Sequence, residues 1–548
     1  MARLTVLDLR RNNFTGRLPP LCAQSTSLST IILNSNQFEG PVPVSLLNCT
    51  GLEVLDLGTN AINDTFPAWL GTLQELQVLI LKSNLFHGPI SSCQTEFCFP
   101  KVRIFDLSLN EFSGSLPAKV FGNFKAMIKL DGEDTGEIKY MEPSMTSSYS
   151  SYEVSVSLVI KGQDIELEKI TTIMTTIDLS SNHFEGVIPK TLKDLGYSIS
   201  PATISKGKLV PKTMSWNDST DCCTWDGVTC DMLTGHVIGV DLSCSLLHGT
   251  IHPNSSLVQN TFETLLQNFT KLEVLSLYSV NVSSPIPMNL SSSLRRNADV
   301  FINLQELVEL DLSNNSFIGP LPSLILSLTR LQRLDLPSNS LSGPLSSNTS
   351  MLQKLTFVDL SYNSLNGTIP SWVFRLPLLS WLSLDHNQLS GLVDELKANT
   401  TLEYLDLRHN QFSGPVLRSL GNLGPLPSSI CNMSSLTFLA LSHNYFSDSV
   451  PHCLGSMVEL SVLDLRGNNF TGSLPPLCEH STSLSTIVLN GNGFEGPVPV
   501  SLLNCHGLEV LDIGNNAINH TFPAWLGTLE ELQVLILKSN KFHGPYKY

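Results

Sequence analysis

One pattern of apolar and polar positions recurs about every 24 residues along the chain, and it reads LxxLxLxxNxFxGxIP. Alternation with a period of two indicates a short strand with one buried face, and a fixed period of this length is typical of leucine-rich repeats. The units begin at Leu4, Leu28, Leu52, Leu76, Val102 and Met174, and then at Val237, Leu272, Leu307, Leu331, Leu355, Leu379, Leu402, Leu436, Leu460, Leu484, Leu508 and Leu532. The chain is therefore predicted to be a solenoid of stacked units.

Residues 52–75, LEVLDLGTNAINDTFPAWLGTLQE, show how one unit is expected to fold. The side chains alternate between two directions, inward for Leu52, Leu55 and Leu57, and outward for Val54, Asp56 and Gly58. Asn60 turns the chain, because its amide pairs with backbone groups that a tight bend leaves unpaired. The Phe-x-Gly-x-Leu/Ile-Pro segment adds a second extended stretch on the opposite side, so long helices are not expected.

Residues 1–89 reappear as residues 457–545 with 16 substitutions. The duplication indicates two truncated copies of one protein in a single chain. A length of 548 residues is too great for one compact core, since single cores stop growing at roughly 250–300 residues. We therefore expect an α/β solenoid in two arcs, with short parallel concave strands and little regular helix.

Two further features carry a resemblance to a known family. Residues 222–230 read CCTWDGVTC, and a segment without the repeat pattern precedes TTIDLSSNHFEGVIP. With the repeats, they resemble plant leucine-rich-repeat receptor-like proteins of the disease-resistance type. The resemblance implies a curved right-handed superhelix with an N-terminal cysteine cap and a late island that interrupts the repeats. Placing 215–545 before 90–196 would restore the order of that family.

The expected organisation follows from this resemblance. The first copy supplies late repeats in 1–126, an island in 127–173 and one repeat in 174–197, and a linker spans 198–214. The second copy supplies a cysteine cap in 215–244 and truncated repeats in 245–548. Uncapped ends at Leu4, near Tyr197 and at Pro545 would expose leucines. Spacings of 35 and 34 residues, after Leu272 and Leu402, predict a bulge or a broken stack.

The island is expected to contain a hairpin, because Val154, Val156, Leu158 and Ile160 alternate with polar residues ahead of Ile165 and Leu167. Two interpretations remain open for it. It is either a flexible surface insertion or an element that binds a ligand or a co-receptor, since insertions in solenoids tend to lie on a binding face.

Export signals and membrane spans are not visible in this sequence. MARLTVLDLRRNN is charged where a signal peptide is apolar, and no window holds about 18 uncharged apolar residues. The resemblance implies the extracellular face of the plasma membrane, through an anchor outside this chain. Fifteen N-x-Ser/Thr sites reflect either chance or glycosylation. They include Asn13, Asn48, Asn63, Asn268, Asn366, Asn399, Asn469 and Asn519.

Charge and cysteine content exclude several classes of function. A net charge of -16 argues against nucleic-acid binding. Among the 12 cysteines, the resembled cap implies a Cys223–Cys230 disulfide and leaves Cys222 without a partner. Other cysteines are expected to be small buried hydrophobes rather than metal ligands, namely Cys22, Cys49, Cys244, Cys478 and Cys505. We expect no metal site and no cofactor.

Catalytic motifs are missing from the sequence: it has no GxSxG elbow, phosphate loop, HExxH or kinase catalytic loop, so the protein is not expected to be an enzyme. One strand position recurrently holds a carboxylate. It is interpreted as a solvated column of Asp8, Asp56, Asp106, Asp178, Asp335, Asp359 and Asp406.

Stacked strands about 4.8 Å apart align equivalent positions into columns on the surface. The third position gives Arg333, Phe357, Trp381 and Tyr404, and the eighth gives Tyr362, His386 and His409. The first column is a candidate ligand-binding hot spot, and the second would make binding respond to pH between about 5 and 7. Free variation of a repeat surface is the alternative.

The resemblance implies a non-catalytic plant-defence receptor that binds a peptide or pathogen-derived ligand and signals through a partner receptor kinase. Two alternatives stay open. The same repeat type occurs in soluble inhibitors of secreted cell-wall-degrading enzymes, and the duplication also fits a non-functional fused gene product.

Overall fold

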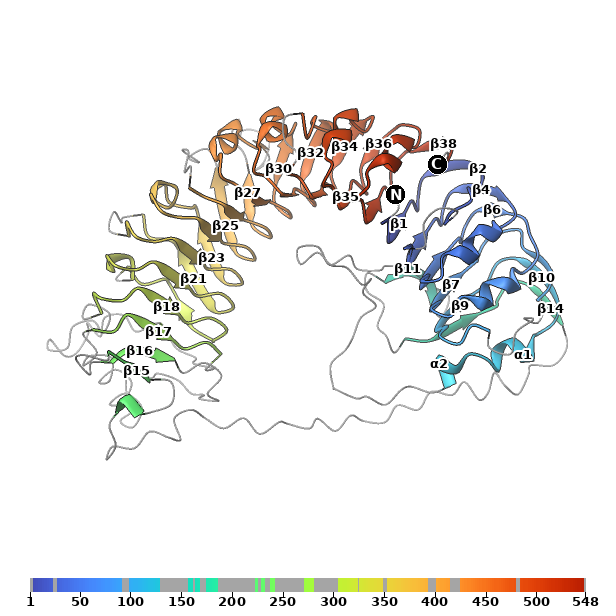
Figure 1. Cartoon of the computed structure of the whole chain (residues 1–548), viewed down its shortest axis with the longest axis horizontal. Coiled ribbons are helices and arrows are strands. Elements are labelled where there is room, and N and C mark those ends of the chain that lie inside the picture. Colours follow the sequence, from blue (N-terminus) through green and yellow to red (C-terminus); the bar gives the residue numbers. More distant parts are fainter. Residues whose placement is uncertain are drawn as a thin grey trace. The chain divides into compact units, whose positions relative to one another are not determined.

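Short parallel strands make up almost all of the regular structure in the computed structural model (Figure 1). It describes residues 3–22, 27–90, 98–128, 156–160, 163–167, 174–185, 222–224, 228–231, 237–241, 271–279, 304–323, 325–347, 352–392, 401–413, 424–479 and 483–546. The chain divides into two units, one made of Met1–Lys206 with Ser485–Tyr548 and the other of Gly207–Leu484.

The first unit contains one parallel ladder on its concave side. In spatial order its strands are β33 (Thr486–Val488), β35 (Val510–Asp512), β37 (Val534–Ile536), β1 (Val6–Asp8), β3 (Thr30–Ile32), β5 (Val54–Asp56), β7 (Val78–Ile80), β9 (Ile104–Asp106) and β13 (Thr176–Asp178). The C-terminal strand β37 thus precedes the N-terminal strand β1, and the two chain ends lie side by side (Figure 1).

Each unit also carries short strands on its other side, at the Phe-x-Gly-x-Leu/Ile-Pro segments. In the first unit these are β34 (Gly493–Gly496), β36 (Ala517–Ile518), β38 (His543–Pro545), β2 (Asn13–Arg17), β4 (Gln37–Gly40), β6 (Ala61–Ile62), β8 (His87–Pro89), β10 (Glu111–Ser115) and β14 (His183–Glu185). Among the described residues, helix is confined to the single turns α1 (Ala118–Phe121) and α2 (Lys125–Ile128) and to 3₁₀ turns. The predicted solenoid with little helix is confirmed.

The second unit begins with β15 (Val228–Cys230), which is antiparallel to β16 (Val237–Asp241). Parallel strands then follow in chain order: β17 (Val274–Ser276), β18 (Glu309–Asp311), β20 (Arg333–Asp335), β22 (Phe357–Asp359), β24 (Trp381–Ser383), β26 (Tyr404–Asp406), β29 (Phe438–Ala440) and β31 (Val462–Asp464). On the other side lie β19 (Ile318–Gly319), β21 (Ser340–Pro344), β23 (Ser364–Gly367), β25 (Gln388–Leu392), β27 (Gln411–Ser413), β28 (Gly424–Pro425), β30 (Phe446–Asp448) and β32 (Asn469–Ser473).

The two irregular repeat spacings do not break the concave ladder of the second unit. β17 pairs with β18 at Val274 and Glu309, and β26 pairs with β29 at Tyr404 and Phe438. The concave ladder therefore continues across both irregular spacings.

Asparagine side chains join each repeat to the one before it. The Asn60 Nδ2 donates to the carbonyl oxygens of Leu57 at 3.0 Å and of Leu33, in the preceding repeat, at 3.1 Å. Its Oδ1 accepts from the Phe38 backbone N–H at 3.1 Å. Asn36, Asn84, Asn110, Asn339, Asn363 and Asn516 repeat this pattern. The turn predicted for Asn60 is confirmed.

The interpretation of the recurrent aspartates as a solvated column is wrong for Asp8, Asp56, Asp106 and Asp406. The other members, Asp178, Asp335 and Asp359, are half-buried. Asp8 and Asp56 are fully buried, and Asp106 and Asp406 are 1% exposed. Adjacent strands cover the carboxylate, and its Oδ1 accepts the backbone N–H two residues later, as from Gly58 to Asp56 at 2.9 Å. Such an aspartate therefore caps the bend at the end of its own strand, as Asp8, Asp56 and Asp106 do. Val54 is buried in the same way, although its side chain was expected to face outward.

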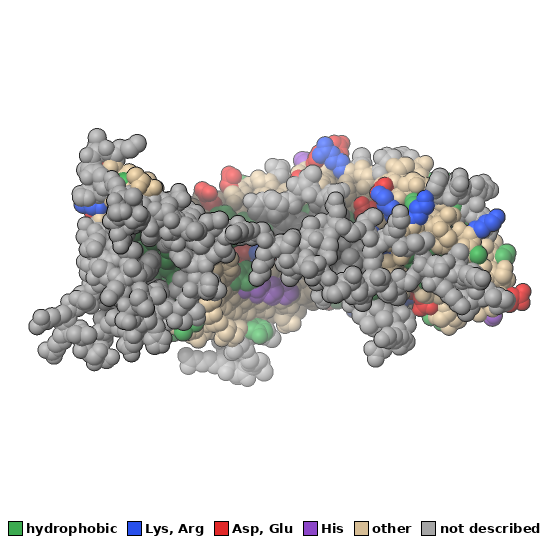
Figure 2. Space-filling view, turned by 90° about the horizontal axis from the view of Figure 1, so that it is seen from below, with side chains coloured by type: hydrophobic (Ala, Val, Ile, Leu, Met, Phe, Trp, Pro, Cys, Tyr) green, Lys and Arg blue, Asp and Glu red, His purple; other side chains and the backbone are tan. Residues whose placement is uncertain are grey.

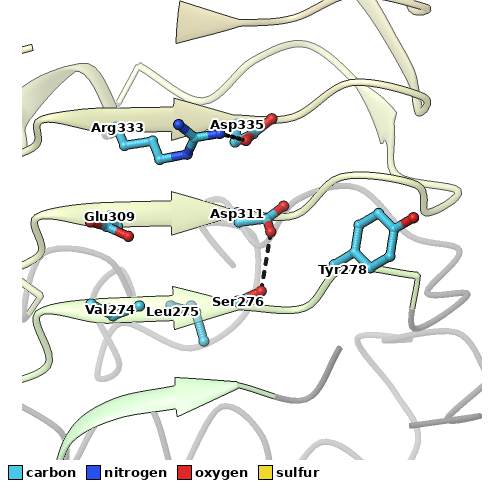
Figure 3. A pocket seen from close by; sticks show the side chains of 8 residues that line it. All are labelled: Val274, Leu275, Ser276, Tyr278, Glu309, Asp311, Arg333 and Asp335. Carbon is cyan, nitrogen blue, oxygen red and sulfur yellow. Dashed lines mark hydrogen bonds and ion pairs between the residues drawn. The ribbon is translucent and has the colours of Figure 1, made fainter. Parts of the chain in front are cut away.

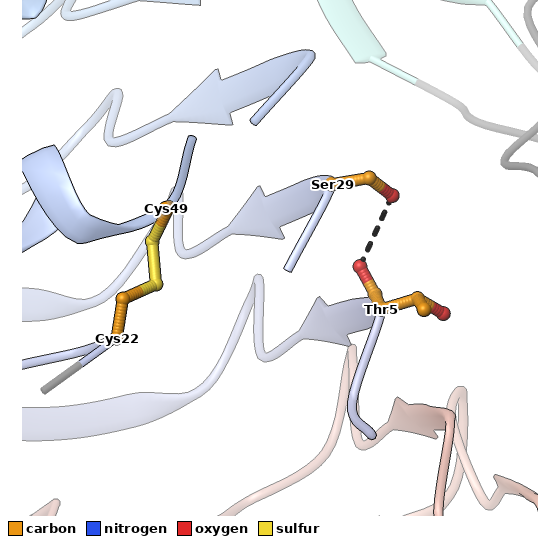
Figure 4. The surroundings of a disulfide bond; sticks show 4 residues. All are labelled: Thr5, Cys22, Ser29 and Cys49. Carbon is orange, nitrogen blue, oxygen red and sulfur yellow. Dashed lines mark hydrogen bonds between the residues drawn. A yellow bond between two sulfur atoms is a disulfide. The ribbon is translucent and has the colours of Figure 1, made fainter. Parts of the chain in front are cut away.

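Several cysteines are also not the free buried hydrophobes that the sequence suggested. Cys22 is bonded to Cys49, with a Cα–Cα distance of 5.5 Å (Figure 4), and Cys431 is bonded to Cys453. Cys478 and Cys505 are disulfide-bonded as well. The separations of 27 and 22 residues are close to one repeat, so stacking brings equivalent loops within disulfide range. Cys244 lies outside the described residues.

The hairpin expected inside the island is present. β11 (Val156–Ile160) is antiparallel to β12 (Gln163–Leu167), with Val156 opposite Leu167. Residues 129–155 of the island and the linker 198–214 lie outside the described residues. The ends at Leu4 and Pro545 were expected to be uncapped, but they cover each other. The repeat that ends near Pro545 stacks on the repeat that begins at Leu4.

We expect Asn60→Ala to lower the free energy of unfolding by about 3 kcal/mol, because it removes hydrogen bonds to buried backbone groups of two repeats. Asn63→Ala is the matched control: its exposed side chain should make the loss no more than about 0.5 kcal/mol. Urea denaturation measures the free energy of unfolding of both variants. Equal losses would contradict a stabilising role for the asparagine hydrogen bonds between repeats.

The buried Asp56 predicts an unusual dependence of stability on pH. Burial raises the pKa of Asp56 to about 7, so its carboxyl holds a proton more tightly in the folded state. Its contribution is complete below pH ~4 and is lost as the pH rises through ~7. Asp56→Asn imitates the protonated form and should gain roughly 3 kcal/mol over the wild type between pH ~4 and ~8. If Asp56→Asn stabilised the protein by the same amount at every pH, the raised pKa of Asp56 would be contradicted.

Candidate concave binding face

Five consecutive strands of the second unit align their third-position side chains. The register places Arg333, Phe357, Trp381, Tyr404 and Phe438 opposite one another on β20, β22, β24, β26 and β29. The Arg333 Cζ lies 3.6 Å from the Phe357 ring centroid. Ring centroids then follow at 5.6, 3.5 and 4.2 Å, with interplanar angles of 17°, 2° and 8°. We call this set the aromatic column.

Stacking determines what the aromatic column offers to a ligand. Each ring face is covered by the next ring, and Arg333 covers the outer face of Phe357 through a cation–π contact. The ring edges of Phe357, Trp381 and Tyr404, which carry the positive part of the aromatic quadrupole, remain partly exposed, whereas Phe438 is buried. The column therefore suits carbonyl oxygens and apolar side chains better than a flat ring that needs an open face.

Phe438 belongs to the aromatic column but was not among the residues expected from the sequence. The spacing between Leu402 and Leu436 is 34 residues instead of about 24, so the regular period does not place Phe438 next to Tyr404. Counting the third position from Leu436 gives Phe438 directly. The same irregular repeat hid His443.

A second column runs parallel to the first. Tyr362, His386, His409 and His443 stack with centroid distances of 4.0, 4.1 and 4.2 Å. All four have positive φ angles between 50° and 53°. Each directly precedes one of the asparagines whose side chains join neighbouring repeats. Gly467 follows in this position, where a Cβ would lie 2.6 Å from the His443 Nδ1. We call this set the imidazole column, and Figure 2 shows histidine side chains gathered in one patch.

Ion pairs lie beside the two columns. The Arg408 guanidinium forms a bidentate contact with Asp406, with Nη2–Oδ2 at 2.6 Å and Nε–Oδ1 at 2.9 Å. Arg333 is paired with Asp335 in addition to its contact with Phe357. Asp385 accepts from the Ser383 hydroxyl at 2.7 Å and contacts the His386 Nδ1 at 2.7 Å. The basic side chains are thus held in fixed positions by neighbouring carboxylates.

Several pKa values on this face depart from their ordinary ranges, among them those of Asp359, His409 and His443. Burial, together with Asp335 and Asp385, raises the pKa of Asp359 to about 6. Partial burial, His443 and His386 lower the pKa of His409 to about 4, and burial lowers that of His443 as well. These shifts move the titration of His409 below the range from 5 to 7 expected from the sequence.

A shallow cavity of about 410 Å³ adjoins the Arg333 end of the aromatic column (Figure 3). Its lining includes Ser276, Tyr278, Glu309 and Asp311, and the Ser276 hydroxyl donates to Asp311 at 3.1 Å. Tyr278 is 42% exposed. A ligand that lies along the column would reach this cavity at β17 and β18.

The remaining expected site residues lie away from the two columns. A disulfide joins Cys223 to Cys230 in the segment that precedes the parallel strands, and the Cys222 side chain lies outside the described residues. Six of the eight named glycosylation sites are exposed: Asn13, Asn48, Asn63, Asn366, Asn469 and Asn519. Asn268 and Asn399 lie outside the described residues.

Within the described ranges, no cluster of His, Cys, Asp and Glu has the geometry to hold a metal ion. In the same part of the chain, no helix has the length and apolar character that crossing a membrane requires.

Family models match repeated parts of the chain. Leucine rich repeat models match residues 353–412 and 482–542, and also 3–25, 174–195, 306–328, 435–457 and 459–481. A Leucine rich repeat N-terminal domain model matches residues 205–231, which include Cys223 and Cys230.

Curated relatives are receptor-like proteins of Arabidopsis thaliana. Receptor-like protein 54 is 32% identical over 35% of this chain and 27% of its own length. Receptor-like protein 53 is 39% identical over 34% of this chain and 19% of its own length. The chain therefore matches less than a third of either relative.

Solved structures with a similar fold include plant receptor ectodomains. The plant peptide hormone receptor RGFR1 in complex with RGF2 has 23% identity and a TM-score of 0.45, with 99% of this chain and 75% of that chain covered. The GASSHO1/SCHENGEN3 ectodomain from Arabidopsis thaliana has 25% identity and a TM-score of 0.41, with coverage of 98% and 53%.

We expect His409 to titrate with a midpoint near 4, so that its imidazole stays neutral between pH ~5 and ~7. Because the neutral form is favoured in the folded state, this group's contribution to stability is complete above ~6.5 and is lost as the pH falls toward 4. NMR of the histidine Cε1–H resonances measures the midpoint. His443→Ala should raise it, and a wild-type midpoint near 6.5 would contradict the assignment.

Proposed function

We propose that this chain, a plant leucine-rich-repeat protein of the receptor-like type, is a non-catalytic recognition protein that binds a peptide or pathogen-derived ligand. The ligand would lie on the concave strands of the second unit. The aromatic column is the observation that carries the proposal, because the stacked, half-buried rings of Phe357, Trp381 and Tyr404 form a rigid surface beside Arg333.

The dimensions of the column fit an extended peptide. Four steps of about 4.8 Å between β20 and β29 span roughly 19 Å. An extended chain advances about 3.4 Å per residue, so this span accommodates roughly six residues. The stacked side chains are already ordered before binding, which reduces the entropy that association costs. Arg333 and Arg408 are likewise held by Asp335 and Asp406, so fixed polar groups flank the rings.

The finer role in this proposal is plant defence signalling at the extracellular face of the plasma membrane, with receptor kinases as signalling partners. The similarity to receptor-like proteins supports the receptor type from which this finer role is proposed. The exposed glycosylation sites and the disulfides are consistent with an oxidising, exported environment.

A phage-displayed library of short random peptides is a suitable first probe, and titration calorimetry would measure the affinity of a selected peptide. Trp381→Ala and Tyr404→Ala should each weaken binding by about 2 kcal/mol, or about thirtyfold in Kd, because each removes a central ring from the stack.

Tyr445→Ala is the matched control, since Tyr445 is 49% exposed and lies outside both columns. It should leave the affinity unchanged. Selected peptides that bind both column variants as tightly as the wild type would refute the concave site.

A further inference from the structure

The two chain ends form a repeat–repeat interface within the first unit, which we call the seam. β1 pairs with β37 at Val6 and Val534, and β2 pairs with β38. The Thr5 backbone N–H donates to the Gln533 carbonyl at 2.8 Å, and the Leu537 N–H donates back to the Asp8 carbonyl at 2.9 Å.

Contacts at the seam match those of a step between covalently consecutive repeats. The Asn12 Nδ2 donates to the Leu537 carbonyl at 3.0 Å, and the Asn36 Nδ2 makes the same 3.0 Å bond to Leu9 one step later. The Phe14 centroid lies 6.1 Å from both Phe542 and Phe38.

An ion pair between Arg3 and Glu531 closes the outer edge of the seam. Lys101 and Glu75 form the equivalent pair between consecutive repeats. The seam therefore contains the strand, asparagine, aromatic and ion-pair contacts that join neighbouring repeats in this unit, without a direct peptide connection.

Two different surfaces meet at the seam, because residues 3–22 present the starting face of a repeat and residues 532–546 present the finishing face. Such a heterologous contact forms equally well between two molecules, and repetition of it gives head-to-tail assemblies. Closure within one chain is favoured over contact between two molecules only because the two ends are tethered. The effective concentration of one end near the other falls as the connecting chain lengthens. Here the covalent connection runs through the rest of the molecule.

We propose that the seam is a docking surface for a second copy of the chain. The finishing face of one copy, residues 532–546, stacks on the starting face of another, residues 3–22, in exchange with the self-closed form. The repeats of residues 485–546 and of residues 3–90 then follow one another across two molecules as they do within the first unit of one. Neither the aromatic nor the imidazole column takes part in this contact.

Cysteine pairs across the seam test the proposal. Thr5 and Gln533 are partly exposed and lie opposite each other on adjacent strands, within the Cα separation that a disulfide needs. Full-length Thr5→Cys and Gln533→Cys chains are mixed, oxidised mildly and digested, and the linked peptide is quantified by mass spectrometry. The fraction of chains in the linked peptide should rise roughly tenfold for a tenfold increase in protein concentration, as long as most copies remain self-closed.

Ser29→Cys mixed with Glu53→Cys is the matched control, because these residues directly precede β3 and β5 and lie opposite each other between two covalently consecutive repeats. This mixture should give no linked peptide. The double variant Thr5→Cys/Gln533→Cys shows whether the seam forms at all. Two results would overturn the proposal. In the first, the double variant links within one chain, but the mixture of single variants links no more than the control. In the second, the double variant itself fails to link.

Discussion

Parallel strands about 4.8 Å apart are held in register by a ladder of asparagine amides, and the other features of this protein depend on that register. Each ladder amide bonds backbone groups of its own repeat and of the preceding one, as Asn60 does with Leu57 and Leu33. No repeat can bury its leucines alone, so the ladder and the apolar interior act together. Because the register is fixed, side chains at equivalent positions must touch.

This enforced contact has different consequences at different positions. At the third strand position it produces the stacked rings of Phe357, Trp381 and Tyr404. At the position of Asp56 it removes a carboxylate from water and raises its pKa. At the loops of Cys22 and Cys49 it brings two thiols into bonding distance. A binding face, a titrating group and a covalent link thus have the same geometric origin.

The repeat unit, the asparagine turn and most of the two columns could be predicted from the sequence, because a strict period converts position along the chain into position in space. Burial could not, since strand alternation gives the direction of the Asp56 side chain but not the covering of that face by its neighbours. Phe438 and His443 were missed because an irregular repeat separates them from Tyr404 and His409. The seam was missed because periodicity describes neighbours in sequence, whereas Val6 and Val534 are neighbours only in space.

The positive φ angles of the imidazole column have a consequence for how such a surface diversifies. Ladder bonds at Asn363, Asn387 and Asn410 fix the backbone on the C-terminal side of each column residue, whichever side chain that residue carries. Tyr362 and His386 occupy the same backbone conformation as Ser338 and Asn314, although their side chains differ in size and chemistry. Single codon changes at this position can therefore alter what the surface recognises while the scaffold persists, which lets specificity evolve separately from folding.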